Sequence, residues 1–134
     1  MSSVVLTVGT GHTLREAARR MADKKVGAAV VLDEDAPGPG ILSERDLLLS
    51  IGRGEDPDKE LVGDHMSDSP ITAAPDWSLE RAAVEMSRRH VRHLIIVDGG
   101  EIVGILSMRD IVRCWTSDGA TSSTVSPEVE ASRA

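Results

Sequence analysis

The chain has 134 residues and a formal net charge of −7, which suits one ordinary domain or two small units that share a core. The acidic balance argues against a nucleic-acid binder that neutralises phosphates over a broad basic face. No apolar run approaches the ~20 residues that cross a bilayer, and the N-terminus lacks signal-peptide features. We therefore expect a cytoplasmic protein with no membrane partner, in which the lone Cys114 is a buried, reduced thiol.

The first half of the chain predicts a strand, a helix, two strands and a second helix. Apolar residues alternate between strand-like runs and helical spacing, and the boundaries fall at capping residues or glycines. Thr13 and Glu16 form a capping pattern, and the small-apolar run at 28–32 is typical of a strand covered on both faces. The predicted elements are a strand at 4–8, a helix from 13 to about 25, strands at 28–32 and 41–42, and a helix from 43 to about 52.

The second half repeats this order after an acidic segment at 55–69, in which one helical turn is expected. Its predicted elements are a strand at 71–73, a helix at 78–90, strands at 94–97 and 102–106, and a helix from 107 to about 115. The remaining residues are rich in Ser, Thr, Glu and Ala, so we expect disorder there or a helix that docks on a partner. The predicted organisation is a repeat at 1–54, a linker at 55–69, a second repeat at 70–115 and a tail at 116–134.

The same phrase closes both halves, as GILSERDL at 40–47 and GILSMRDI at 104–111. Around it, Thr7 corresponds to Thr72 at a spacing of 65 residues, and the spacing drops to 64 after the loop at 36–39. A repeat of fixed period indicates one supersecondary unit used twice. Because each half would be marginally stable alone, we expect the two to pack together.

The phrase places a serine between a strand and a helix, with an aspartate three residues further on. Serine and aspartate could simply cap the helix, since both satisfy or complement its first N–H groups. The same geometry suits a nucleotide, because N–H groups and a hydroxyl bind phosphate while an aspartate accepts from both ribose hydroxyls. Arginine could add contacts to phosphate, and its repetition favours the second interpretation, since capping does not require it. The residues concerned are Ser43, Arg45, Asp46, Ser107, Arg109 and Asp110.

With this repeat, this element order and the phrase Gly-Ile-Leu-Ser-x-Arg-Asp, residues 4–115 resemble a pair of CBS domains, as found in small stand-alone bacterial proteins. VRHLIIVD at 91–98 and VGDHM at 62–66 also resemble segments of this family. The resemblance implies an α/β (α+β) fold of tandem βαββα repeats packed about a pseudo-two-fold axis. It also implies a non-enzymatic regulatory module that needs no cofactor, binds AMP, ADP, ATP or S-adenosylmethionine in clefts between the repeats, and signals to a partner protein.

By position in the motif, the resemblance further implies ligand contacts. The aspartates would hold ribose, the serines and arginines of the phrase would face phosphate, and two threonines would line the base. Arg92 and His93 would also face phosphate, whereas the first repeat has Gly27 and Ala28 at these positions, so we expect unequal sites. The predicted ligand-binding set is Thr7, Ser43, Arg45, Asp46, Thr72, Arg92, His93, Ser107, Arg109 and Asp110.

A ligand-free scaffold for dimerisation or interaction is an alternative, in which serine and aspartate only cap helices. The helices that open at Ser43 and Ser107 carry more apolar residues than one small sheet needs for cover. Because CBS pairs resemble this in forming dimers through such helices, we expect a homodimer. The apolar residues concerned are Leu47, Leu48, Leu49, Ile51, Ile111, Val112 and Trp115.

An enzyme is a further alternative, but the sequence shows no assembled nucleophile, base and orienting partner. None of the histidines forms a zinc-type pair with Cys114, and the acidic pair Glu55-Asp56 is attributed to solubility. We therefore expect no catalytic residues and no metal ligands, and magnesium bound with a nucleotide has no support. The scattered histidines are His12, His65, His90 and His93.

Overall fold

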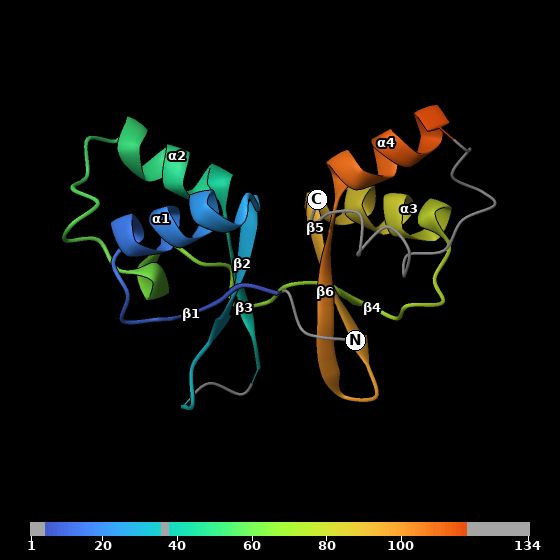
Figure 1. The fold of residues 1–134 in the computed structure, drawn as a ribbon, viewed down its shortest axis with the longest axis horizontal. Coiled ribbons are helices and arrows are strands. Elements are labelled where there is room, and N and C mark those ends of the chain that lie inside the picture. The colour runs from blue at the N-terminus through green and yellow to red at the C-terminus, as the bar shows by residue number, and fades with distance from the viewer. Residues whose placement is uncertain (1–4, 36–37, 118–134) are drawn as a thin grey trace. The chain divides into compact units, whose positions relative to one another are not determined.

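The computed structural model describes residues 5–35 and 38–117, which form two compact units (Figure 1). From Leu6 onward, the boundary between the units falls between Pro70 and Ile71. Each unit has a three-stranded sheet and two α-helices in the order strand, helix, strand, strand, helix. The predicted α/β fold of tandem βαββα repeats is thus confirmed. Within the described ranges, no helix combines the length and the apolar character that a bilayer crossing requires.

The first unit consists of β1 (Thr7–Gly9), α1 (Leu14–Lys24), β2 (Ala28–Leu32), β3 (Gly40–Ser43), α2 (Glu44–Gly52) and the 3₁₀ turn η1 (Val62–Asp64). The sheet order is β1-β2-β3, in which β2 pairs parallel with β1 and antiparallel with β3. Strand β1 starts later than the strand predicted at 4–8, since its pairing with β2 begins at Thr7 opposite Val30. Residue 4 of that prediction lies outside the described part of the chain.

The second unit consists of β4 (Thr72–Ala73), α3 (Leu79–Arg89), β5 (His93–Asp98), β6 (Glu101–Ser107) and α4 (Met108–Ser117). Its sheet order, β4-β5-β6, repeats the first with the same strand directions. Gly99 and Gly100 connect β5 to β6 with φ values of 59° and 84°, which glycine adopts without a steric penalty. Helix α4 continues to Ser117, past the predicted end, and the rest of the predicted tail lies outside the described residues.

The two cores are built from equivalent positions. In each unit the first helix buries residues spaced three and four apart against its own sheet, as an amphipathic helix requires. Strand β2 is buried along most of its length, as predicted for 28–32, and β5 is buried at 94–96. The residues that match in the sequence repeat therefore occupy equivalent positions in the two cores. The matching core residues are Leu14, Ala17 and Met21 in α1 and Leu79, Ala82 and Met86 in α3.

Helices α1 and α3 end in the same way. Lys25 and His90 adopt left-handed backbone conformations with φ values of 57° and 56°. In the first unit the N–H of Val26 donates to the carbonyl of Met21 at 3.0 Å, and the second unit has the equivalent bond at the same length. This is a Schellman-type termination, in which glycine usually occupies the left-handed position. Both helices therefore end on a non-glycine residue whose backbone conformation is unfavourable.

The segment predicted as a linker, residues 55–69, is packed onto the first unit. Val62 of η1 is fully buried in the core of that unit. The backbone N–H of Leu14 donates to the carbonyl of Glu60 at 2.9 Å, and Ser67 exchanges backbone hydrogen bonds of 2.9 Å with Ile41 of β3. The first unit is thus completed by residues that follow its last helix.

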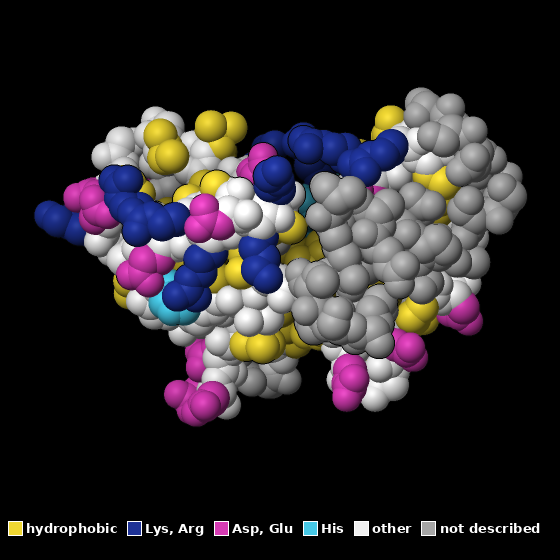
Figure 2. All heavy atoms as spheres, viewed as in Figure 1, with side chains coloured by type: hydrophobic (Ala, Val, Ile, Leu, Met, Phe, Trp, Pro, Cys, Tyr) yellow, Lys and Arg dark blue, Asp and Glu magenta, His cyan; other side chains and the backbone are white. Residues whose placement is uncertain are grey.

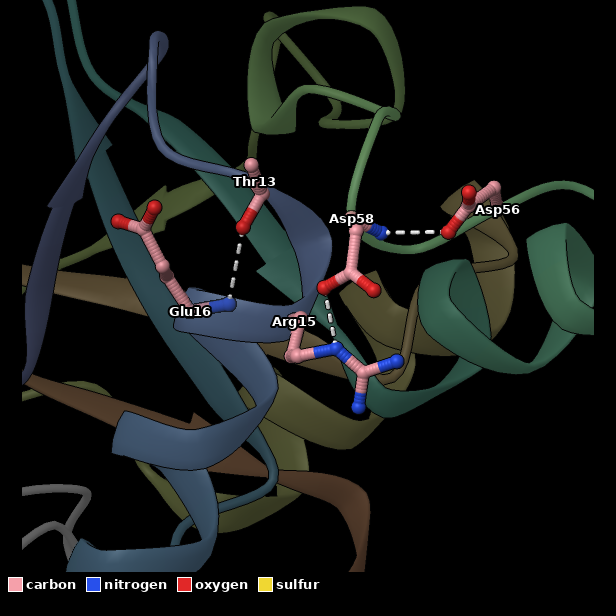
Figure 3. Close-up of polar contacts among 5 residues, drawn as sticks. All are labelled: Thr13, Arg15, Glu16, Asp56 and Asp58. Atoms are coloured by element: carbon pink, nitrogen blue, oxygen red, sulfur yellow. Dashed lines mark hydrogen bonds and ion pairs between the residues drawn. The ribbon is translucent and has the colours of Figure 1, made fainter.

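Side chains at the start of α1 add to this docking (Figure 3). Thr13 caps the helix, because its Oγ1 accepts from the N–H of Glu16 at 3.2 Å. Arg15 donates from Nε to Asp58 of the linker segment, and the N–H of Asp58 donates to Oδ1 of Asp56 at 2.9 Å. The hydrogen bond and charge of Asp58 raise the pKa of Arg15. Since both partners of this ion pair are exposed, the pair stabilises the docking only weakly.

Candidate ligand-binding junctions

Strand β3 runs directly into α2 at Ser43, which has the extended backbone of a helix N-cap. The carboxylate of Asp46 folds back onto this residue. Its Oδ2 accepts from the N–H of Ser43 at 2.7 Å and from the Ser43 hydroxyl at 3.1 Å. The Ser43 side chain also faces the N–H of Asp46, so this junction is a capping box. Both contacts described for the Asp46 carboxylate go to Oδ2, and the side chain is half-buried. The other carboxylate oxygen of Asp46 is therefore available as an acceptor.

At the equivalent junction between β6 and α4, the aspartate makes more contacts. Oδ2 of Asp110 accepts from the N–H of Ser107 at 3.0 Å and from its hydroxyl at 2.7 Å. The Ser107 hydroxyl in turn accepts from the N–H of Asp110 at 3.1 Å, which completes a reciprocal capping box. Asp110 is only 2% exposed, and its Oδ1 lies 3.5 Å from Nη2 of Arg113. Both oxygens of this aspartate are thus engaged.

These contacts confirm the capping interpretation of both Ser-x-x-Asp phrases. They do not test the ligand-binding interpretation, because a cap leaves the remaining N–H groups of the first helical turn facing outward. Arg45 and Arg109, on the exposed side of the same turns, have no described ion-pair partner among residues 5–35 and 38–117. Their guanidinium groups are thus available to an anion.

The strand register places the predicted threonine and serine of each repeat on one face of its sheet. Thr7 lies opposite Val30, which lies opposite Ile41, two residues before Ser43. Paired residues, and residues two apart on one strand, share a face. This face is the one turned away from the helical core, which is built from the alternate residues of the same strands. Thr72 has the same relation to Ser107 through Ile95 and Ile105.

The predicted basic pair lies beside the second junction. His93 is the register partner of Ser107, and the carbonyl of Arg92 accepts from the N–H of Met108 at 2.8 Å. The Arg92 side chain is exposed, while that of His93 is half-buried and has an interaction partner. The structure therefore brings Arg92, His93, Ser107 and Asp110 together at the start of α4.

At the first junction an acidic side chain lies over the position that corresponds to Arg92. There the carbonyl of Gly27 accepts from the N–H of Glu44 at 3.0 Å. A Cβ placed on Gly27 would lie 2.4 Å from Oε1 of Glu44, so the Glu44 carboxylate covers this glycine. Glu44 is not among the junction residues expected from the sequence. The signal was present, because Glu44 stands where the second phrase has Met108, and the only other difference is a leucine for an isoleucine at the last position.

The fold and the two capped junctions define a tandem pair of CBS domains, and the comparisons agree. The CBS domain family model matches the chain twice, at residues 1–53 and 62–116. The chain therefore belongs to the CBS-domain family. It is 34% identical over 112 residues to the CBS domain-containing protein YhcV of Bacillus subtilis, covering 83% of this chain and 79% of that protein. It is 33% identical to protein MK0525 of Methanopyrus kandleri over 81% of this chain, but spans only 57% of that relative.

Solved structures show the same architecture. A CBS-domain protein from Burkholderia ambifaria superposes with a TM-score of 0.77 at 28% identity, covering 86% of this chain and 85% of the other. The CBS domain protein PAE2072 from Pyrobaculum aerophilum, solved in complex with AMP, has a TM-score of 0.70 at 33% identity. The superposition covers 81% of this chain and 84% of that protein. The tandem CBS fold is thus shared along most of the chain.

Proposed function

We propose that this chain is a regulatory module that binds an adenine nucleotide, such as AMP, ADP, ATP or S-adenosylmethionine, and signals to a partner protein. The observation that carries the proposal is the capped strand-to-helix junction, which occurs twice in register with an exposed arginine each time. The AMP complex of PAE2072, a similar CBS-domain protein, supports the choice of ligand class. The function is regulatory rather than catalytic, and the nucleotide is a signal rather than a cofactor.

The proposed contacts follow the chemistry of the junctions. Phosphate binds to the helix N-terminus and to the exposed arginines, because N–H groups and guanidinium groups both donate to anions. The ribose hydroxyls donate to the carboxylates of Asp46 and Asp110, and the base lies toward Thr7 and Thr72. Of the two carboxylates, Asp46 has the more available oxygen, since Asp110 also contacts an arginine on its own helix.

The phosphate group binds preferentially at the second junction. Arg92 and His93 supply donors there, whereas the Glu44 carboxylate lies over the corresponding Gly27 in the first unit. A carboxylate repels a phosphate, and a guanidinium attracts it through charge-assisted hydrogen bonds. We expect one dominant nucleotide site per chain, or two sites of unequal affinity.

Isothermal titration calorimetry with AMP and adenosine tests this assignment on the Arg92→Ala variant. A charge-assisted hydrogen bond contributes roughly 1.5–3 kcal/mol, so losing Arg92 should weaken AMP by about 10-fold or more. Adenosine, which has no phosphate, should bind this variant as it binds the wild type. The matched control is Arg20→Ala, which removes an exposed arginine of α1 that belongs to neither junction phrase.

Two results would refute the assignment. Equal loss of AMP and adenosine binding in Arg92→Ala would show that this residue does not bind phosphate. Two equal, independent sites in the wild type would rule out the proposed difference between the junctions. A thermal-shift panel with AMP, ADP, ATP and S-adenosylmethionine identifies the preferred ligand, because a ligand that binds the native state raises its stability.

We further propose that the chain forms a homodimer through α2. This helix leaves large apolar side chains at the surface, with Leu48 69%, Leu49 44% and Ile51 61% exposed. Hydrophobic side chains are visible over α2 in Figure 2. Val112 of α4, the repeat equivalent of Leu48, is 51% exposed.

Two residues of the predicted apolar set do not belong to this surface. Leu47 packs against the core of the first unit, and Ile111 is buried in the core of the second. Both lie on the inward side of their helices. The side chain of Trp115, also in the predicted set, lies outside the described part of the chain. The surface available to a second copy is therefore narrower than the sequence suggests.

A further inference from the structure

Three side chains of the segment that docks onto the first unit lie close together. Glu55 follows α2, Glu60 lies in the loop beyond it, and His65 follows η1. One ligand atom from each residue, a carboxylate oxygen or a ring nitrogen, lies within 4.8 Å of the other two. From the sequence, no metal ligands are expected and Glu55 is attributed to solubility. The cluster was not evident because folding of the loop brings together residues that are five and ten positions apart.

Glu55 has an unexplained buried oxygen. Its Oε1 is buried and has no hydrogen-bond partner among the residues that the structure describes. A buried acceptor without a partner costs roughly 1–3 kcal/mol, and more when the group is charged. Such an atom in a native protein calls for a missing water, ion or proton. The nearest groups of the cluster are Glu60 and His65, which already interact with each other.

The contact between His65 and Glu60 fits a metal-binding pair. Nε2 of His65 lies 2.8 Å from Oε1 of Glu60, and the histidine side chain is only 9% exposed. Without a metal, Nε2–H can donate a hydrogen bond to the carboxylate. With a metal, the same two atoms become ligands and separate to about 3.4 Å, the spacing in a tetrahedral zinc site. Glu55 has to approach by up to about 1.4 Å to complete such a site, which rotation of a glutamate side chain can supply.

We propose that Glu55, Glu60 and His65 bind a divalent transition-metal ion, for which Zn²⁺ is the representative. Two carboxylates and one neutral imidazole carry a combined charge of −2, which a divalent cation neutralises. Imidazole favours zinc-type ions, whereas Mg²⁺ and Ca²⁺ require six or more oxygen ligands. Three protein ligands leave a fourth position for water or for an atom of a partner.

The backbone around the ligands is already fixed. The N–H of Glu55 donates to the carbonyl of Ser50 at 3.2 Å, and the N–H of His65 donates to the carbonyl of Val62 at 3.0 Å. Between them, the carbonyl of Glu60 accepts from Leu14 at 2.9 Å. A bound metal would therefore connect the end of α2 to η1 without rebuilding the loop. This site is independent of the proposed nucleotide function.

The test uses the full chain without a histidine tag, treated with a chelator and then dialysed. Titration with ZnCl₂ should give one site per chain of micromolar or tighter affinity, and the thermal midpoint should rise with zinc concentration. Glu55→Gln and His65→Ala should each weaken zinc binding at least about 10-fold, since ligand removal costs at least as much as loss of a supporting residue. His90→Asn, which changes an exposed histidine in the other unit, should bind zinc as the wild type does.

Co²⁺ reports the ligand atoms directly. Bound Co²⁺ should show the visible bands of nitrogen and oxygen ligation, whereas a sulfur-to-metal charge-transfer band would assign the ion to Cys114 and overturn the proposal. It would also be overturned by a wild type that binds no zinc, by equal affinity in Glu55→Gln and His65→Ala, or by Mg²⁺ that binds as tightly as zinc. If His65→Ala fails to fold, Glu60→Gln replaces it in the comparison. Without metal, Glu55→Gln should be at least as stable as the wild type, because it removes the charge from a carboxylate whose buried oxygen has no described partner.

Discussion

Lys25 ends α1 in a left-handed conformation that costs a residue with a side chain roughly 1–2 kcal/mol. Glycine adopts this conformation freely but loses about 0.5–1 kcal/mol through its more flexible unfolded state. We therefore expect Lys25→Gly to raise the free energy of unfolding by up to about 1 kcal/mol, measured by urea denaturation. Lys24→Gly, at the last residue of the helix, is the control and should lower it by up to about 1 kcal/mol. A destabilised Lys25→Gly variant would contradict the Schellman-type assignment.

The candidate nucleotide residues could be predicted where the chemistry is local. Ser107 and Asp110 are three residues apart, so their spacing alone predicts the capping box that the structure contains. The position of Glu44 over Gly27 could not be predicted locally, because only the pairing of β2 with β3 brings its carboxylate to this glycine. Glu55 is a stronger case, since no local pattern tells a solvated loop glutamate from one with a buried oxygen.

The docked segment at 55–69 belongs energetically to the first unit, and Val62 provides the test. This residue is fully buried in a core formed with α1 and the first sheet. Val62→Ala removes two buried methyl groups and should lower the free energy of unfolding by about 2 kcal/mol. Leu61→Ala is the control, because Leu61 is 39% exposed and its backbone contact with Thr13 survives the change. Equal losses in the two variants would mean that the segment does not contribute to the core.

Helices and strands were predictable because their periodic patterns are long compared with the error at their ends. The helix predicted from 13 to about 25 is found at Leu14–Lys24, and the strand predicted at 28–32 is found at Ala28–Leu32. The docking of 55–69 was not predictable in this way. Leu61, Val62 and Met66 are too few apolar residues in a polar segment to show a period. The burial of Val62 depends on backbone hydrogen bonds from Val62 to His12 and from Gly63 to Thr10, which are distant in sequence.

At the scale of the whole molecule, the exposed apolar side of α2 predicts self-association. Leu48 and Ile51 are three residues apart and thus lie on one side of the helix. Leu48→Glu with Ile51→Glu should leave the fold unchanged, because neither side chain is in a core, but should shift sedimentation from a dimer to a 14.3 kDa monomer. Val84→Glu is the matched control, since Val84 is 50% exposed on another helix. A wild type that sediments as a monomer at micromolar concentration would exclude the dimer.

The bridge between Ile41 and Ser67 has a consequence for the order of events during synthesis. Domains generally fold as units while the chain emerges from the ribosome, with the N-terminal one first. Here the nascent first repeat lacks Val62 and the partner of Ile41 until residue 67 has left the exit tunnel. Until then the ribosome holds an incomplete repeat with an open core. A gene fragment cut after α2 would make the same incomplete species permanently, so a minimal expression unit for this repeat has to extend through Ser67.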